Sequence, residues 1–85
     1  MEEYNFDNFK QYLRLKGFSN RTIISYLYYN NNLLKLARKT PRNIAEKDIK
    51  NYLDYLVLNI NASVSTVNIA YSALKSYYWH VYKNS

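Results

Sequence analysis

Apolar residues recur every three or four positions through most of this chain, which is the spacing of one face of an α-helix. The first such stretch predicts a helix whose apolar side consists of Phe6, Phe9, Tyr12 and Leu13. Gly17 ends this helix, because glycine readily adopts the left-handed conformation found just past helix ends. Ser19 then stands at a preferred N-cap position for a second helix. The apolar positions of that second helix are Ile23, Tyr26, Leu27, Leu33, Leu34 and Ala37.

Residues 39–43 are predicted to form a loop, since they contain the single proline and proline disfavours helix in the residue before it. A third helix is predicted from about Glu46 to Leu58. Its first turn holds Glu46 and Asp48, where carboxylates are favoured by the helix dipole. The apolar positions of this third helix are Ile49, Tyr52, Leu53 and Leu56.

Residues 59–62 break the helical pattern, and Ser63 or Ser65 is expected to cap a fourth helix. The apolar positions of this helix are Val67, Ala70, Tyr71, Leu74, Tyr78 and Val81. The chain has only one glycine and one proline, so a fold with many β-hairpins is not expected. We therefore predict an all-α fold, a compact bundle of four or five helices that forms a single domain over residues 1–85.

The net charge of +6 at pH 7 is distributed unevenly along the chain. Residues 8–45 hold eight basic side chains and no acidic one. The basic residues are Lys10, Arg14, Lys16, Arg21, Lys35, Arg38, Lys39 and Arg42. A stretch of this length whose charged side chains are all basic produces a positive electrostatic potential, which favours a polyanionic partner. A solvated surface that only keeps a small domain soluble explains the same charges, so both interpretations stay open.

Several kinds of chemistry are missing from the sequence. The chain has no cysteine and a single histidine, His80, which is expected to be a partly buried helical residue rather than a general base. A single glycine also cannot build a phosphate-binding loop. We therefore expect no catalysis, cofactor, metal or small-molecule substrate. Apolar runs are shorter than the roughly 20 residues that span a bilayer and the amino terminus is acidic, so we expect a cytoplasmic location and no membrane partner.

The chain contains eleven tyrosines, most of which are expected to pack their rings in the core. Those on apolar stripes are Tyr12, Tyr26, Tyr52, Tyr71 and Tyr78. Tyr28 and Tyr29 are predicted on the polar side of the second helix, near Arg21 and Ser25. A tyrosine hydroxyl there is either simply exposed or donates to a phosphate oxygen. Tyr29 is our candidate for such a contact.

Small polar residues predominate on the exposed sides of the second and fourth helices. On the second helix these are Thr22, Ser25 and Asn32, with the cation Arg21, and on the fourth they are Ser65, Asn68 and Ser72, with the cation Lys75. Small hydroxyl and amide side chains let a helix approach DNA closely and bond phosphates or base edges. The N–H groups at helix amino ends also attract phosphate. Helix faces that pack against another protein domain favour the same residue types, so that alternative stays open.

Three segments of the chain together resemble a known family. The first comprises residues 9–13 and 16–19 with Thr22, Tyr26 and Leu33; the second comprises residues 43–49 with Tyr52 and Leu53; the third comprises residues 65–68 and 72–78. Taken in this order, they cover nearly the whole chain. The chain resembles the amino-terminal core-binding domain of tyrosine recombinases, which include the phage integrases and the Xer-type enzymes that resolve chromosome dimers.

The resemblance implies a SAM-like orthogonal bundle that covers one side of duplex DNA, with the second and fourth helices facing adjacent grooves. The residues implied to neutralise phosphates are Lys16, Arg21 and Lys75. Those implied to bond backbone oxygens near the helix amino ends are Ser19, Thr22, Ser65 and Thr66. The candidates for base edges are Ser25, Asn68 and Ser72. The implied partners are double-stranded DNA and a recombinase catalytic domain or other protomers.

The chain departs from the family pattern at several positions. Ala45 stands where a threonine cap is common, Ile69 and Ala70 stand where an arginine pair is frequent, and Asn30 replaces a usual apolar residue. The catalytic domain of the family is absent from these 85 residues, so no tyrosine here takes the role of its nucleophile. Two other interpretations remain: a helical protein-interaction or dimerisation module, and a fragment of an enzyme with little DNA affinity of its own.

Overall fold

The computed structural model describes the backbone of residues 5–82 and the side chains of residues 5–79. This part of the chain forms helices α1 (Asp7–Leu15), α2 (Asn20–Ala37), α3 (Glu46–Leu58) and α4 (Val64–Lys75), with a 3-10 helix η1 (Pro41–Asn43) and a π-helix η2 (Ser76–Tyr82). Residues 5–82 contain no strand, so the predicted all-α bundle is confirmed. The side chains of His80 and Val81, on which the sequence makes predictions, lie outside the described residues.

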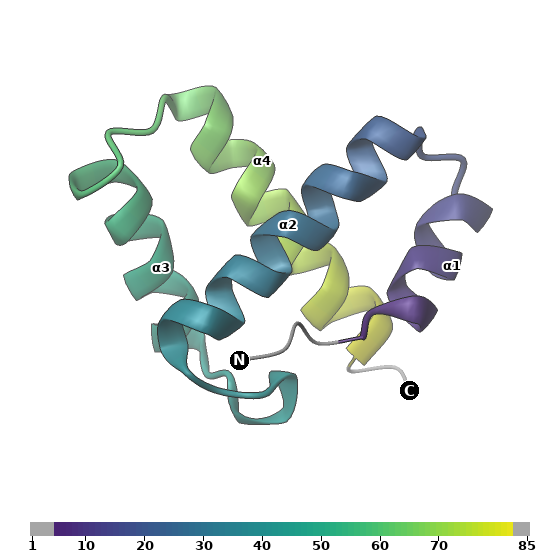
Figure 1. Ribbon diagram of the computed structural model, residues 1–85, viewed down its shortest axis with the longest axis horizontal. Coiled ribbons are helices and arrows are strands. Elements are labelled where there is room, and N and C mark those ends of the chain that lie inside the picture. Colours follow the sequence, from purple (N-terminus) through teal and green to yellow (C-terminus); the bar gives the residue numbers. More distant parts are fainter. Residues whose placement is uncertain (1–4, 83–85) are drawn as a thin grey trace.

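Helix α2 lies at the centre of the bundle and crosses α4, so that the two helices form an X in Figure 1. Helix α1 packs against α2 and η2, while α3 packs against α2 and α4 on the other side. The amino ends of α2 and α4 form the two upper arms of the X, and their carboxyl ends point to the opposite edge. One edge of the molecule therefore carries the positive ends of two helix dipoles.

The core lies where the helices meet and is mainly apolar and aromatic. The buried hydrophobic side chains are Phe6, Phe9, Leu13, Ile23, Leu33, Leu34, Ile49, Tyr52, Leu56, Ala70, Ala73, Leu74, Tyr77 and Tyr78. The rings of Phe6 and Phe9 meet Tyr77 edge to face, with centroid separations of 5.0 and 5.2 Å. These ring contacts attach the amino-terminal part of the chain to the end of the α4–η2 segment.

Helices α2 and α4 begin with the same local structure. Ser19 Oγ accepts a hydrogen bond from the Thr22 N–H at 3.2 Å and donates one to Thr22 Oγ1 at 3.1 Å. Ser63 and Thr66 repeat both bonds at the same distances, so Ser63 is the correct one of the two predicted caps. Gly17 has a φ of 86° after α1, which confirms its predicted role at the end of that helix.

The three consecutive asparagines do not interrupt α2, although asparagine has a low helix propensity. Asn31 Nδ2 donates to the Leu27 carbonyl one turn earlier at 3.2 Å. Asn32 Oδ1 accepts a bond from the Tyr52 hydroxyl of α3 at 2.7 Å, and burial raises the pKa of Tyr52 above its ordinary value. Asn30 is buried in the core. The three asparagine side chains therefore differ in their surroundings: Asn30 lies in the core, Asn31 bonds within α2 and Asn32 bonds to α3.

Two predictions about aromatic side chains are wrong. Tyr71, predicted on the apolar side of the fourth helix, is 43% exposed, whereas Tyr77 is buried. Helix α4 turns Ala70 and Ala73 into the core, and this orientation leaves Tyr71 at the edge. Tyr29, predicted on the polar side of the second helix, is half-buried and packs against the core. The cause in both cases is the rotation of a helix about its own axis, which packing determines.

Helix α3 begins without a side-chain cap, because Ala45 at the N-cap position has no acceptor. Asp48 takes over part of this role, since its Oδ2 accepts the Ala45 N–H at 2.8 Å. Lys39 Nζ also donates to both carboxylate oxygens of Asp48, at 2.9 and 3.1 Å. The bond from the Ala45 N–H, followed by that from Lys39, lowers the pKa of Asp48 below its ordinary value.

We expect Asp48→Asn to lower the free energy of unfolding at pH 7 by about 1–2 kcal/mol, because a helix-end bond and a charge-assisted bond weaken. The pKa of Asp48 is lower in the folded chain than the 3.8 of the free group. Its stabilisation is therefore present above that value and is lost as the pH falls through the folded pKa. Urea unfolding of both proteins at pH 7 and at about pH 2 measures the change.

The difference between wild type and Asp48→Asn should be present at pH 7 and small in acid. Asp54→Asn is the matched control, because Asp54 is exposed on the same helix. A difference of equal size at both pH values would show that Asp48 does not stabilise the fold through its charge.

Candidate nucleic-acid interface

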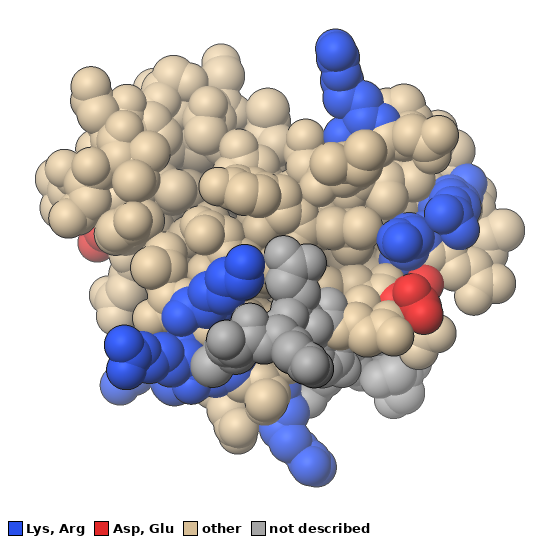
Figure 2. Space-filling model, in the orientation of Figure 1, with Lys and Arg blue, Asp and Glu red and all other residues tan. Residues whose placement is uncertain are grey.

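Neither of the two crossing helices carries a carboxylate, since α2 and α4 contain no Asp or Glu. Two acidic side chains of α3 are paired with lysines: Asp48 with Lys39 at 2.9 Å and Glu46 with Lys50 at 3.9 Å. Figure 2 shows basic side chains over α1 and near both ends of α2, with one acidic group beside the basic side chains at α1 and another at the left margin. Basic side chains therefore outnumber acidic ones over α1 and α2 in this view, which favours a positive potential there.

The amino end of α2 brings together several groups that favour an anion. The bond from the Thr22 N–H to Ser19 Oγ satisfies one of the first N–H groups of the helix. The N–H groups of Asn20 and Arg21 have no carbonyl group one turn earlier in the helix to bond. Arg21 is exposed at this end, and Lys16 is exposed just before it. The backbone and the side chains therefore both suit a phosphate group here.

The amino end of α4 repeats the backbone arrangement but has no charged side chain nearby in the sequence, since residues 55–74 contain none. Ser63 provides the cap, and the N–H groups of Val64 and Ser65 have no carbonyl one turn earlier in the helix. Ser65 is exposed, whereas Thr66 is half-buried and its Oγ1 accepts a bond from Ser63 Oγ. In Figure 1 the two amino ends lie along one edge of the molecule, although the crossing helices point away from each other there, so that edge carries two similar anion-attracting helix ends.

The other predicted residues lie along the two helices. Asn68, Ser72 and Lys75 are exposed on α4, and with Ser65 they follow steps of three and four residues, which places them on one side of the helix. Ser25 is half-buried on α2. All of the predicted DNA-contacting residues are thus at least partly accessible, and none lies in the core. Their contact with DNA stays a prediction.

The fold brings Tyr29 of α2 and Thr66 of α4 to the same hollow, which has a volume of about 190 Å³. Tyr28 also lines it, is 59% exposed, and has its ring centroid 5.2 Å from that of Tyr29. Tyr28 is therefore the more accessible of the two neighbours, although the sequence prediction selected Tyr29. The sequence spacing could have indicated this difference. Tyr29 follows Tyr26 by three residues and precedes Leu33 by four, which places Tyr29 on the apolar side of the helix.

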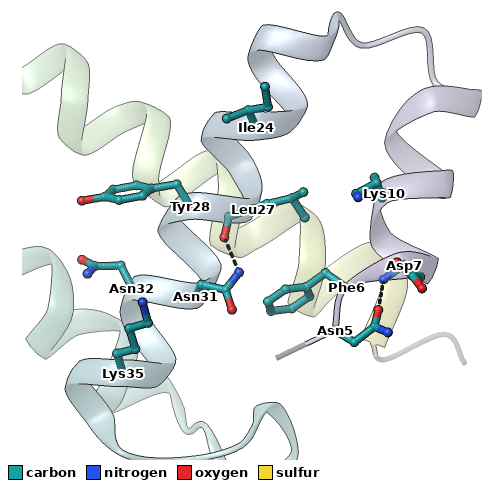
Figure 3. A pocket seen from close by; sticks show the side chains of 10 residues that line it. All are labelled: Asn5, Phe6, Asp7, Lys10, Ile24, Leu27, Tyr28, Asn31, Asn32 and Lys35. Carbon is teal, nitrogen blue, oxygen red and sulfur yellow. Dashed lines mark hydrogen bonds between the residues drawn. The ribbon is translucent and has the colours of Figure 1, made fainter. Parts of the chain in front are cut away.

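A larger hollow of about 540 Å³ lies between α1 and α2 and is shown in Figure 3. Tyr28 and Ile24 lie along the α2 side of this hollow, and Lys10 of α1 lies across from them. Lys35 and Asp7 also line it. Of these side chains only Tyr28 was considered from the sequence as a hydrogen-bond donor to phosphate, although both lysines belong to the basic stretch of residues 8–45.

No group of three or more histidine, cysteine, aspartate or glutamate side chains gathers as a metal site among the residues that the structure describes. Within the same part of the chain, no helix combines the length and apolar character needed to cross a membrane. The groups that this surface does offer are lysine and arginine side chains, hydroxyls, amides and free helix ends. These are the groups that proteins use to bond phosphates.

Comparison with models of protein families finds a match over residues 6–85 to the model described as phage integrase, N-terminal SAM-like domain. The match covers almost the whole chain and agrees with the helical bundle, so it confirms the resemblance carried by the three sequence segments. A comparison with curated protein sequences finds no match. On the strength of the family match, this chain belongs to the phage integrase N-terminal SAM-like domain family.

Proposed function

We propose that this chain is the DNA-binding module of a tyrosine site-specific recombinase or integrase and that it contacts duplex DNA with α2 and α4. The family match over residues 6–85 supports the recombinase context. The observation that supports these two helices is their lack of carboxylates together with the position of both amino ends at one edge. In this proposal residues 1–85 act as one cytoplasmic domain, and a catalytic domain or other protomers are its protein partners.

The accessible groups suggest a division of roles along the two helices. Lys16, Arg21 and Lys75 are exposed cations that neutralise phosphates in this proposal. The helix amino ends, with the hydroxyls of Ser19, Thr22, Ser65 and Thr66, bond backbone oxygens. Asn68, Ser25 and Ser72 are placed farther along the helices, where side chains reach base edges in a groove. Tyr29, and with it the more exposed Tyr28, donates to a neighbouring phosphate.

We expect Arg21→Ala and Asn68→Ala to weaken DNA binding in different ways. Loss of the Arg21 cation should weaken binding to all duplexes alike and reduce the slope of log affinity against log salt by about 1. Loss of the Asn68 amide should leave that slope unchanged and alter sequence preference, at a cost of about 1–3 kcal/mol for the preferred base. Selection from a pool of random duplexes, followed by salt titration, measures both effects.

Lys47→Ala is a suitable control, because Lys47 is an exposed lysine on α3, outside the proposed surface. It should change neither the preferred sequences nor the affinity by more than about twofold. If Arg21→Ala and Asn68→Ala both bind and select DNA as the wild type does, α2 and α4 do not form the contact surface.

An apolar corner favours a second candidate function, that of a protein-interaction or dimerisation module. We define the apolar corner as Val57, Leu58, Ile60 and Val64, which are 48, 80, 55 and 78% exposed where α3 ends and α4 begins. Residues 55–74 contain no charged side chain, and this region is free of blue and red at the upper left of Figure 2. Grouped exposed apolar residues are typical of protein contact sites, whereas isolated ones are common.

If the apolar corner joins two copies of the chain, sedimentation should show a dimer whose population rises with concentration and persists at high salt. Leu58→Asp should then weaken that dimer by at least about tenfold, because it introduces a charge into an apolar contact. Leu15→Asp is the matched control, since Leu15 is 81% exposed and lies outside the corner. A wild-type chain that stays monomeric at all concentrations would exclude self-association through the apolar corner.

A further inference from the structure

Asn30 is a polar side chain in the middle of the apolar core. It is 1% exposed, and its apolar neighbours on the same side of α2, Ile23, Leu33 and Leu34, are buried with it. Burial of an amide is unfavourable unless the amide is hydrogen-bonded. The bonds of Asn30 therefore show what this residue contributes to the fold.

Asn30 Nδ2 donates two hydrogen bonds. One goes to the Tyr26 carbonyl within α2 at 3.0 Å, and the other goes to the Ala73 carbonyl of α4 at 3.1 Å. Asn30 Oδ1 is buried and has no hydrogen-bond partner in the described part of the chain. A leucine at this position would leave no such acceptor unsatisfied. The unsatisfied oxygen therefore opposes the burial of Asn30, and the distinctive contribution of this residue is the bond between the two helices.

The bond to Ala73 joins the two helices that cross in Figure 1. On α4 the buried residues of this region include Ala70 and Ala73, both 0% exposed. Large side chains form the ridges and grooves that favour particular crossing angles, and alanine offers only a low ridge. Leu74 is also fully buried on α4, but the two alanines constrain the angle less than larger side chains would, whereas a hydrogen bond depends on direction.

Ala73 also lies just before the point where α4 becomes the π-helix η2 at Ser76. The change from i→i+4 to i→i+5 bonding alters which N–H group each carbonyl faces. The Ser76 N–H donates hydrogen bonds to the carbonyl oxygens of Ala73 and Ser72. The Asn30 amide donates a second hydrogen bond to the Ala73 carbonyl oxygen. A carbonyl oxygen can accept both bonds. Asn30 thus attaches α2 to a defined point along α4.

We propose that Asn30 is a positioning residue that sets the crossing of α2 and α4 and thereby the spacing of their amino ends. The inference rests on the proposed function, because those amino ends are the proposed phosphate-binding edge. A buried polar residue that bonds across a helix pair selects one arrangement among several that apolar packing allows. Asn30 then determines how DNA is contacted although its side chain is inaccessible to DNA.

The chain contains no cysteine, so spin labels can be attached at two introduced cysteines alone. Asn20→Cys and Val64→Cys place labels at the exposed amino ends of α2 and α4. Pulsed electron paramagnetic resonance then measures the distribution of distances between the two ends. We expect a narrow distribution for the wild-type background. Asn30→Leu should broaden or shift it while the midpoint of thermal unfolding does not fall.

Asn30→Met is a second variant, because the flexible methionine side chain fills irregular space if leucine does not fit. Asn31→Leu is the matched control, since Asn31 is the next residue and its amide donates to Leu27 of the same helix. The control should retain the wild-type distribution. Folded Asn30→Leu and Asn30→Met proteins with the wild-type distribution would overturn the proposal. Failure of both variants to fold would also overturn it, because the amide would then be required for folding itself.

The consequence for DNA is measured with unlabelled protein and a random-sequence duplex. Asn30→Leu should bind about tenfold more weakly, or ~1.4 kcal/mol, because DNA must then select one arrangement of two loosely oriented helices. The salt slope should not change, since the same basic side chains remain. Wild-type affinity with an altered label distribution would show that the crossing does not govern binding. A wild-type chain that binds no DNA at low salt would refute the proposed function, whereas the label distances would still decide the role of Asn30.

Discussion

Affinity for duplex DNA is expected to fall steeply when salt is raised. If the exposed cations neutralise about 4–6 phosphates, the logarithm of affinity should decrease against log salt with a slope of roughly −4 to −5. Between 50 and 200 mM salt this corresponds to a loss of about 250- to 1,000-fold. The reason is the release of counterions from DNA when lysine and arginine side chains replace them. Fluorescence anisotropy of a labelled duplex, titrated at several salt concentrations, measures the slope.

The same slope is expected for duplexes of unrelated sequence, because phosphate contacts carry no sequence information. The titration should begin at low salt, where the electrostatic contribution is largest. A slope near zero would contradict the electrostatic part of the proposed function. DNA binding that appears only at protein concentrations where the chain self-associates would instead favour the apolar corner as a functional dimerisation surface.

Phe9→Ala is expected to unfold the chain. Phe9 is 1% exposed, and its ring centroid lies 6.1 Å from that of Phe6 and 5.2 Å from that of Tyr77. Removal of a buried phenylalanine ring costs about 3–5 kcal/mol. A small domain has a total stability on the order of 5 kcal/mol, so little or none would remain. Far-ultraviolet circular dichroism during thermal unfolding measures the loss of helix.

Leu15→Ala is the control for this substitution, because Leu15 lies on the same helix and is 81% exposed. Its effect on the free energy of unfolding should stay within about 0.5 kcal/mol. If Phe9→Ala unfolds cooperatively at the wild-type temperature, the contact between α1 and Tyr77 does not contribute to the stability of the bundle.

Several helix ends were predictable because local groups determine them, whereas the change from α4 to the π-helix η2 at Ser76 was not predicted. The third helix was expected from Glu46 to Leu58 and has those bounds. Ser19 caps α2 through a bond to a residue only three positions later, and Gly17 ends α1 through its own backbone conformation. Such interactions act within a few residues, so the order of amino acids contains the information needed to identify them.

The orientation of the helices about their axes was less predictable. Tyr71 fits the apolar stripe of α4 by spacing, yet it is exposed because the helix turns Ala70 and Ala73 inward. Tyr29 and Tyr28 are adjacent, and one of them packs against the core while the other is exposed. Overlapping stripes fit the same periodicity, and the choice between them depends on the neighbouring helices.

The sequence by itself determined the helical class, several helix ends and a basic stretch free of acids, since each follows from composition, order or interactions within one turn; the family was identified by resemblance. The tertiary structure alone decided that the amino ends of α2 and α4 share one edge, that Asn30 bonds to Ala73, and that Tyr28 is the more exposed of the two neighbouring tyrosines. These features join parts of the chain that are far apart in sequence. They depend on how whole helices pack, which is the outcome of many weak contacts acting together.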